Sequence, residues 1–232
     1  MSSIIGLGGF SNSGKSTSLK YLNPKETFII SCTNKQLQIP GFRKKYPKVE
    51  IKEGKLLGNW YVSNSYTSIE KIMDAVSRTR PEIKVIVVDD ANYLLSNETF
   101  QTALQKGYEK FSVMAKNYYD LIESCLNYRD DLSIVFISHL ENWGTDIDPK
   151  YRLWTTGKML TTQVNLDGLF SYLLYAEKYE DEESGDIKFR FRTKPGLEDT
   201  CRTVSGCFED KYIEPNMKLV IDTINKFENG DE

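Results

Sequence analysis

The chain has 232 residues, of which 40% are hydrophobic, and this is enough to form one sizeable core. Lys and Arg number 30 and Asp and Glu number 33, so the formal net charge is -3 and any contact with nucleic acid must come from a local patch. The four cysteines form no Cys-x-x-Cys pair, no apolar run approaches the roughly 18 residues of a membrane span, and no signal-peptide pattern is visible. We therefore expect a soluble cytoplasmic protein with reduced cysteines, no zinc site and no membrane contact.

The first predicted element is a short buried strand, residues 4–8, which leads into a glycine-rich loop. Residues 9–16 fit the pattern G-x-x-x-x-G-K-[ST], in which glycines let backbone N–H groups surround a phosphate without a Cβ in the way. Lys15 is expected to reach the β- and γ-phosphates of a nucleotide, and the Ser16 hydroxyl is expected to ligate Mg²⁺. A helix that begins at Ser16 would direct its positive end at the phosphates. The predicted nucleotide-binding residues are Gly9, Phe10, Ser11, Asn12, Ser13, Gly14, Lys15, Ser16 and Thr17.

Apolar strands alternate with helical patterns along the first part of the chain. Besides residues 4–8, compact apolar runs predict strands at 27–32, 85–89 and 132–138. These runs are nearly continuous rather than alternating, as is typical of strands that are buried on both faces of a parallel sheet. The order of the elements predicts an α/β fold with a mostly parallel sheet flanked by helices.

Two helices are predicted between these strands. Residues 67–70, Thr-Ser-Ile-Glu, have the form of a capping box, and apolar residues at helical spacing continue from there to about Arg80. A second apolar stripe predicts a long helix over 111–125. The polar and basic stretch 33–58 carries several turn signals and is expected to be irregular, with one short strand at 49–51.

The C-terminal part has a different pattern. A continuous apolar run at 169–176, an acidic turn at 180–185 and strict alternation at 187–192 predict an antiparallel hairpin. Helical spacing returns after Pro215. Because no repeat or linker divides the chain, we expect one domain over residues 1–232.

Two acidic residues follow the most apolar of the predicted strands. Asp89 ends the run Val-Ile-Val-Val, and an acid in this place is expected to meet Mg²⁺ directly or through water. Since ligands bind at the carboxyl ends of parallel strands, Asp89 and the glycine-rich loop should converge. Asp90 has two open interpretations: it orients or deprotonates an attacking water, or it caps a helix that begins near Asn92.

His139 is the only histidine and follows the strand 132–138, so it is expected at the same edge of the sheet. There it could donate a hydrogen bond toward a γ-phosphate and transmit that state to the next loop, or it could be a structural side chain. The following segment, 140–158, is expected to be a long loop that interleaves aromatic and basic residues, a composition suited to single-stranded nucleic acid. Two aspartates make it only slightly basic, and a contact between protomers accounts for it nearly as well. The candidate nucleic-acid contacts are Trp143, Lys150, Arg152 and Trp154.

Taken together, the motifs resemble the RecA-like phage nucleotide-binding ATPases, a family linked to single-strand annealing and recombination. Beyond the loop and the acid pair, the resemblance includes Phe-Ile-Ser-His139, the stretch 158–170 and the pattern over 206–224. It implies a RecA-like P-loop NTPase fold, binding of ATP with Mg²⁺, and a homo-oligomeric ring or filament on single-stranded DNA. It also implies that His139 senses the γ-phosphate and that the next loop faces DNA. Candidate cations for the site of an adjacent subunit are Lys158, Lys194 and Arg202.

One position departs from this family. RecA-like ATPases carry a catalytic Glu just after the second strand, where this chain has Ser31-Cys-Thr-Asn34. Either Asp90 takes the role of base, with Lys15 and His139 as the other catalytic residues, or hydrolysis is slow. The expected function is therefore an Mg²⁺-dependent ATPase that acts on single-stranded DNA. The alternatives are a nucleotide-dependent assembly protein with little hydrolysis, or a small-molecule kinase, for which no acceptor-binding or lid signature is present.

Overall fold

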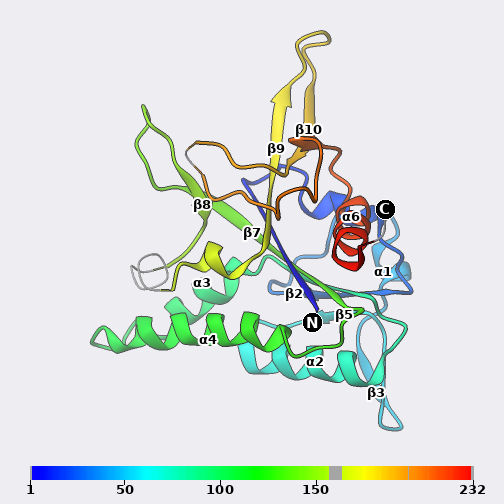
Figure 1. Cartoon of the computed structure of the whole chain (residues 1–232). Helices are drawn as coiled ribbons and strands as arrows, with labels where there is room; N and C mark the ends of the chain where they lie inside the picture. The colour runs from blue at the N-terminus through cyan, green and yellow to red at the C-terminus, as the bar shows by residue number, and fades with distance from the viewer. Residues whose placement is uncertain (1, 157–163, 198, 231–232) are drawn as a thin grey trace.

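The computed structural model describes residues 2–156, 164–197 and 199–230. A mostly parallel sheet runs through the molecule, and helices cover both of its faces (Figure 1). The elements are β1 (Ser3–Gly9), the 3₁₀ helix η1 (Ser16–Tyr21), β2 (Thr27–Ser31), α1 (Phe42–Lys45), β3 (Glu50–Lys52), β4 (Lys55–Leu57), β5 (Trp60–Val62), α2 (Tyr66–Thr79), β6 (Val85–Asp89), α3 (Asn92–Gln101), α4 (Glu109–Cys125), β7 (Ser133–Asn142), β8 (Tyr151–Leu153), the 3₁₀ helix η2 (Leu166–Leu169), β9 (Tyr172–Glu180), β10 (Ile187–Arg192), β11 (Tyr212–Ile213) and α6 (Met217–Asn229).

The order of the strands across the sheet is β11-β10-β9-β1-β7-β6-β2-β5, and β8 pairs with β7 at its far end. All neighbours from β9 to β5 run parallel, whereas β10 and β11 are antiparallel to their neighbours. Strand β1 is central, with β7 on one side and β9 on the other. In this register Gly9, at the end of β1, lies opposite His139 of β7.

Every residue of β1, β2 and β6 is buried. Such strands have no solvent-facing side, which explains why their sequences are continuous apolar runs. The four strands predicted at 4–8, 27–32, 85–89 and 132–138 are therefore confirmed, as are the mostly parallel sheet and the C-terminal hairpin and helix.

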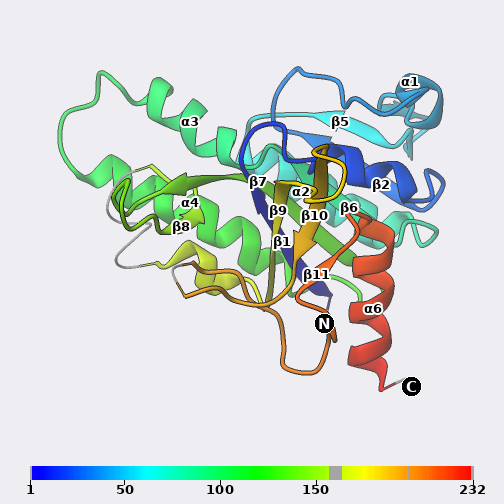
Figure 2. The ribbon, with the colours of Figure 1, turned by 90° about the horizontal axis from the view of Figure 1, so that it is seen from above.

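Two hydrophobic clusters hold the layers together. The first packs α2, α3 and α4 against one face of the sheet, through residues such as Ile69, Leu94 and Ile122. The second packs η1, α1 and α6 against the other face, through residues such as Leu19 and Val220. In the view from above, α6 and the pair α3 and α4 lie on opposite sides of the central strands (Figure 2). None of the described helices has both the length and the apolar composition needed to cross a lipid bilayer.

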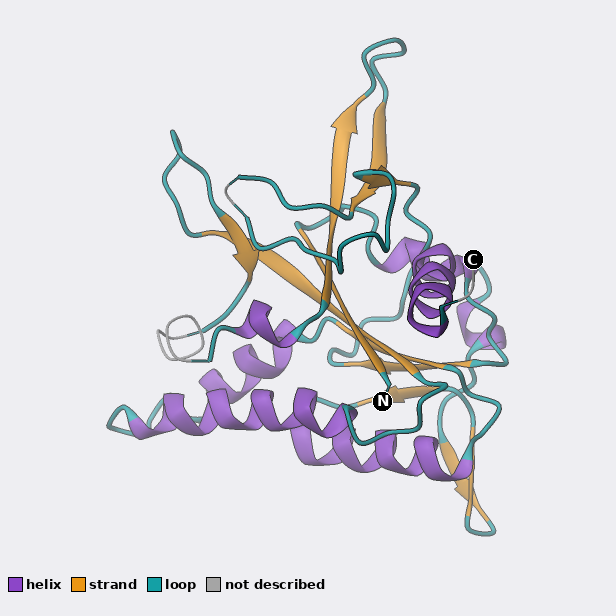
Figure 3. Cartoon of the chain, viewed as in Figure 1, coloured by secondary structure: helices purple, strands orange, loops and turns teal. Residues whose placement is uncertain are grey.

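Residues 140–142 and 151–153 of the predicted loop 140–158 pair as a β-hairpin, so the prediction of one continuous loop is wrong for the described residues; 157 and 158 lie outside them. Strand β7 continues to Asn142 and pairs antiparallel with β8, because Leu140 and Leu153 bury their side chains opposite each other. The apolar run alone had suggested an end at Ser138. This hairpin and the hairpin β9–β10 both project on the side of the molecule away from α2 and α4 (Figure 3).

Three local predictions also need correction. The helix after the glycine-rich loop is a six-residue 3₁₀ helix, in which the Ser18 hydroxyl donates to the Lys15 carbonyl at 2.6 Å and competes with α-helical bonding. Helix α2 begins earlier than the supposed capping box, because the Ser65 side chain accepts from the Ser68 N–H. In the basic stretch 33–58 the short strand expected at 49–51 is present as β3, but the stretch also contains α1 and a second strand, β4, that pairs with β3.

Candidate functional site

The glycine-rich loop and the carboxyl ends of β6 and β7 line one cavity of about 560 Å³. Because β7 lies between β1 and β6, these three strand ends meet at one edge of the sheet. The lining includes loop residues 11–17 together with Asp89, Asp90 and His139. The structure therefore brings together the side chains that the sequence predicted to bind phosphate, to ligate a metal and to take part in catalysis. Of the predicted nucleotide-binding residues, Gly9 and Phe10 lie outside this lining, and the Phe10 ring lies 5.4 Å from that of Tyr151.

The backbone of the loop explains its glycines. A Cβ on Gly9 would lie 2.4 Å from Ser13 Oγ and 2.8 Å from the Ala176 carbonyl oxygen, so no larger residue fits at the end of β1. Gly14 has a φ of 87°, which only glycine adopts without strain. Asn12, with a φ of 60°, is one of the few other residue types that tolerate this region.

Lys15 is part of the glycine-rich loop, and its side chain is buried against the loop backbone. Its Nζ donates to the carbonyl oxygens of Gly9 at 2.6 Å and Phe10 at 2.8 Å. Burial lowers the pKa of Lys15 to about 8, although the carboxylates of Asp89 and Asp90 act in the opposite direction. The ammonium group is therefore a buried donor that two neutral carbonyl oxygens satisfy.

Asp89 lies at the end of β6 with its side chain almost fully buried. Burial, and after it the negative charge of Asp90, raises the pKa of Asp89 to about 7. The Ser16 hydroxyl donates to Asp89 Oδ1 at 3.2 Å, so the predicted pair of metal ligands is in contact. A buried carboxylate with this little compensation favours a cation beside it.

The ligand set fits Mg²⁺ that is bound together with a phosphate. Proteins hold Mg²⁺ through one or two carboxylates, with substrate phosphates and water completing the octahedron. Ser16 and Asp89 supply oxygen ligands of this type. Within the described ranges, no group of three or more His, Cys, Asp or Glu side chains could hold a metal by itself. Phosphate oxygens and water would complete the coordination of a metal held by Ser16 and Asp89.

Asp90 faces the cavity rather than capping a helix. Its φ is 59°, and α3 begins after Ala91 without a side-chain cap, so the capping interpretation is wrong. Thr33 Oγ1 donates to Asp90 Oδ2 at 3.4 Å, and His139 Nε2 lies 3.8 Å from Asp90 Oδ1. A non-glycine residue in this strained region is typical of functional sites.

His139 joins the cavity to the β7–β8 hairpin. Burial, and after it the charge of Lys15, lowers the pKa of His139, so the ring is neutral at pH 7 and has one donor and one acceptor nitrogen. The backbone N–H of His139 donates to Asn92 Oδ1 at 3.2 Å, and its backbone carbonyl accepts from the backbone N–H of Trp154 at 2.8 Å. The backbone on both sides of the ring is therefore fixed.

Sequence patterns missed several residues that line the cavity. Lys35, which follows the end of β2, is one of them, and Thr33 of the same segment reaches the site through its hydrogen bond to Asp90. Phe189 and Pro215 come from the C-terminal third of the chain, and no local motif connects them with the loop. Tyr93 enters from α3 and lies edge-on to His139.

The four nucleic-acid candidates lie on or beside the β7–β8 hairpin but differ in exposure. Trp143 is 51% exposed, and Lys150 Nζ and the Arg152 guanidinium lie 5.6 and 5.5 Å from the centre of its ring. Arg152 also pairs with Glu141 at 2.7 Å. Trp154 packs partly against the first hydrophobic cluster. Only Trp143 thus offers a large open ring.

The three candidate cations for an adjacent subunit have different surroundings. Lys158 lies outside the described residues. Lys194 is exposed and donates to the Glu209 carbonyl at 2.5 Å. The Arg202 guanidinium donates to the carbonyls of Phe170 and Asp167, both at 2.9 Å, and so stabilises its own chain.

Asp89→Asn is expected to stabilise the protein in metal-free solution at alkaline pH. A folded-state pKa of about 7, above the usual value of about 4, means that Asp89 favours the fold at low pH and loses that contribution as the pH rises through 7. The variant should exceed wild type in free energy of unfolding by about 1–3 kcal/mol at pH 8 and by less at pH 4. Urea denaturation in EDTA at both pH values measures this.

The control for this experiment is Asp222→Asn, which removes a half-exposed carboxylate from α6. It should leave the difference between the two pH values as in wild type. An Asp89→Asn protein that gains nothing at pH 8 would contradict a raised pKa at this position.

No family model matches the sequence, and no curated protein shows significant similarity to it. What the cavity binds must therefore be inferred from its side chains and their positions. Those are a buried lysine in a glycine-rich loop, a buried carboxylate in contact with a serine hydroxyl, and a second carboxylate beside a neutral histidine.

Proposed function

We propose that the protein binds ATP with Mg²⁺ and hydrolyses it. The observation that carries this proposal is that Lys15 and the Ser16–Asp89 pair line the same cavity, at the end of the central strand. These groups suit a triphosphate. The Lys15 ammonium would pair with the negative charge of the phosphates, and a metal held by Ser16 and Asp89 would take phosphate oxygens as further ligands.

In this proposal Lys15 exchanges its two carbonyl acceptors for phosphate oxygens. Its ammonium gains charge-assisted hydrogen bonds, which are about twice as strong as those to neutral carbonyls. Ser16 and Asp89 would hold Mg²⁺, which neutralises phosphate charge when it is bound. Asp89 is then fully ionised, because a metal cation opposes the two causes that raise its pKa.

Asp90 is the proposed base, and His139 the proposed donor to the γ-phosphate. The two side chains lie 3.8 Å apart, so a water near one is within reach of the other. A neutral ring can donate one hydrogen bond to a phosphate oxygen while Asp90 accepts the proton of the attacking water. Thr33, which donates to Asp90, orients the carboxylate.

Single-stranded DNA is the proposed macromolecular partner, bound by the β7–β8 hairpin of a RecA-like homo-oligomer. The hairpin begins at His139, and a backbone hydrogen bond links that residue to Trp154. A change at the γ-phosphate could therefore move the hairpin that carries Trp143. Exposed aromatic rings beside cations bind single strands by stacking and charge.

A second candidate function is nucleotide-driven assembly with little turnover. It is favoured by the segment 31–34, Ser-Cys-Thr-Asn, which contains no acid in the region where RecA-like ATPases carry a glutamate. The two functions share the binding site and differ in the role of Asp90.

Lys15→Ala is expected to weaken ATP binding by at least about 100-fold, because the phosphates lose their buried cation. Calorimetric titration of Mg-ATP measures the affinity. The matched control is Lys25→Ala, which removes an exposed lysine outside the cavity and should bind as wild type does. Wild-type affinity in the Lys15 variant would refute the assignment of the loop.

Asp90→Asn is expected to lower the rate of ATP hydrolysis by about 100-fold or more, which is the usual contribution of a general base. Asparagine tolerates the φ of 59° and removes only the charge, so Mg-ATP affinity should be retained. Phosphate release with and without single-stranded DNA measures the rate. An unchanged rate would remove Asp90 from the mechanism, and nucleotide-driven oligomers with no turnover in wild type would favour assembly.

Trp143→Ala is expected to weaken binding of a single-stranded oligonucleotide by about tenfold in the presence of Mg-ATP, because one stacked base is lost. Fluorescence anisotropy of a labelled oligonucleotide measures the affinity. Ile147→Ala, which removes another exposed apolar side chain of the same hairpin, should have little effect. Equal DNA affinity in the two variants would contradict stacking, and ATP affinity should not change in either.

A further inference from the structure

Part of the lining of the cavity is apolar or aromatic, and two of the three residues concerned come from the C-terminal third of the chain. It is formed by Phe189 of β10 and Pro215 before α6, together with Tyr21 at the end of η1. Phe189 is 39% exposed, and its ring lies on the glycine-rich loop: a Cβ on Gly14 would be only 3.3 Å from Phe189 Cδ1. A large aromatic surface is thus open beside the residues proposed to hold the phosphates.

The strand order puts this ring and the acid pair on opposite sides of the loop. Strands β10, β9, β1, β7 and β6 are successive neighbours, so Phe189 and Asp89 lie on strands four spacings apart, about 19 Å across the sheet. The loop follows the middle strand of the five. Lys35, a further cation that lines the cavity, follows β2, beyond β6, and so belongs to the acidic side. In a nucleotide whose terminal phosphate lies toward Asp89 and whose other phosphates lie on the loop, a base that continues in the same direction reaches β10.

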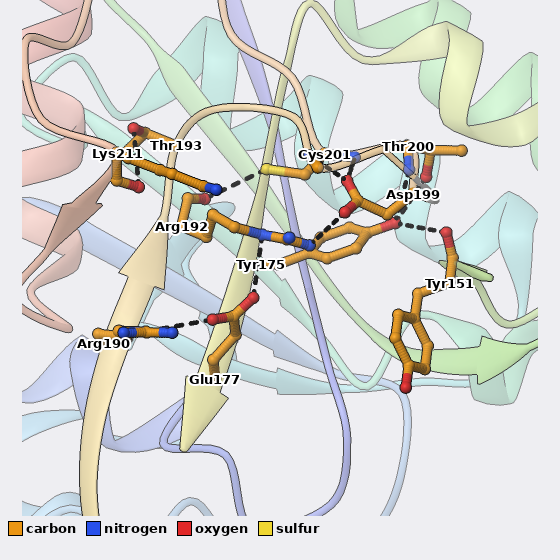
Figure 4. Close-up of polar contacts among 11 residues, drawn as sticks. Tyr151, Tyr175, Glu177, Arg190, Arg192, Thr193, Asp199, Thr200, Cys201 and Lys211 are labelled. Carbon is orange, nitrogen blue, oxygen red and sulfur yellow. Dashed lines mark hydrogen bonds and ion pairs between the residues drawn. The ribbon is translucent and has the colours of Figure 1, made fainter. Parts of the chain in front are cut away.

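Strand β10 is firmly held from its other face. Side chains alternate along a strand, so Arg190 and Arg192 point away from Phe189. Arg190 pairs with Glu177 at 3.2 Å, and Arg192 pairs with Glu177 at 2.9 Å and with Asp199 at 2.7 Å. Figure 4 shows both guanidinium groups converging on Glu177 of the neighbouring strand. Phe189 is therefore presented on a fixed strand rather than on a free loop tip.

Resting on the proposed function, we propose that Phe189 is the platform on which the nucleobase stacks. The substrate class is then nucleoside triphosphates rather than inorganic polyphosphate. Because every base has an aromatic face, the ring contributes equally to ATP and GTP. Phe189 contacts the loop through Gly14, so the base and the phosphates are bound on surfaces that touch.

The test measures the affinities of the full chain for Mg-ATP, Mg-GTP and Mg-tripolyphosphate by calorimetry. Phe189→Ala should weaken ATP and GTP by about tenfold each and leave tripolyphosphate unchanged, because only the nucleotides have a base to stack. Phe189→Trp should retain nucleotide affinity. Phe227→Ala is the matched control, since Phe227 is equally exposed, at 39%, but lies on α6 outside the cavity lining; it should leave all three affinities unchanged.

Two results would overturn the platform while leaving the phosphate site intact. One is an equal loss for all three ligands in Phe189→Ala, which would mean that the ring only shapes the loop. The other is no loss for any of them. A wild-type protein that binds neither ATP nor tripolyphosphate would instead contradict the proposed function itself, together with the platform that rests on it.

Discussion

The electrostatics of the cavity depend on one buried carboxylate, that of Asp89 at the end of β6. Burial and the adjacent Asp90 hold the pKa of Asp89 near 7, so ionising it in the absence of a ligand costs free energy. Lys15 carries an opposite charge into the same cavity, yet its donors are taken by two loop carbonyls. Under the proposed function, a metal and a triphosphate satisfy both residues at once. The charges of Asp89 and Lys15 are then balanced by the ligand and its metal rather than by other groups of the protein.

The sheet gives this constraint its geometry. Inserting β7 between β1 and β6 places His139 between the loop and the acid pair, and the same strand continues outward as the β7–β8 hairpin. On the other side of β1, the strands β9 and β10 bring Phe189 against the loop. One central strand is thus bordered by an acidic side and an aromatic side, and each side leads into a projecting hairpin.

The sequence predicted the parts of this site that are local in the chain. The loop over residues 9–16, the acid at Asp89 and the four buried strands each have a short pattern with a physical cause. The four strands are present, and loop residues 11–17 and Asp89 line one cavity, while their binding roles stay a prediction. Phe189 could not be predicted, because its place beside Gly14 depends on pairing between strands that are distant in sequence. The hairpin after His139 was missed for a related reason: one buried leucine on each strand extends the pairing where the apolar run has already stopped.

The position of β1 has a consequence for biosynthesis. Ile5 pairs with Val135 on one side and with Tyr172 on the other, so both partners of this apolar strand are translated long after it. Until then β1 is an unpaired, aggregation-prone apolar strand, and pairing over such long sequence separations is slow. A chain shortened before β9 would keep one edge of β1 unpaired even with β7 in place.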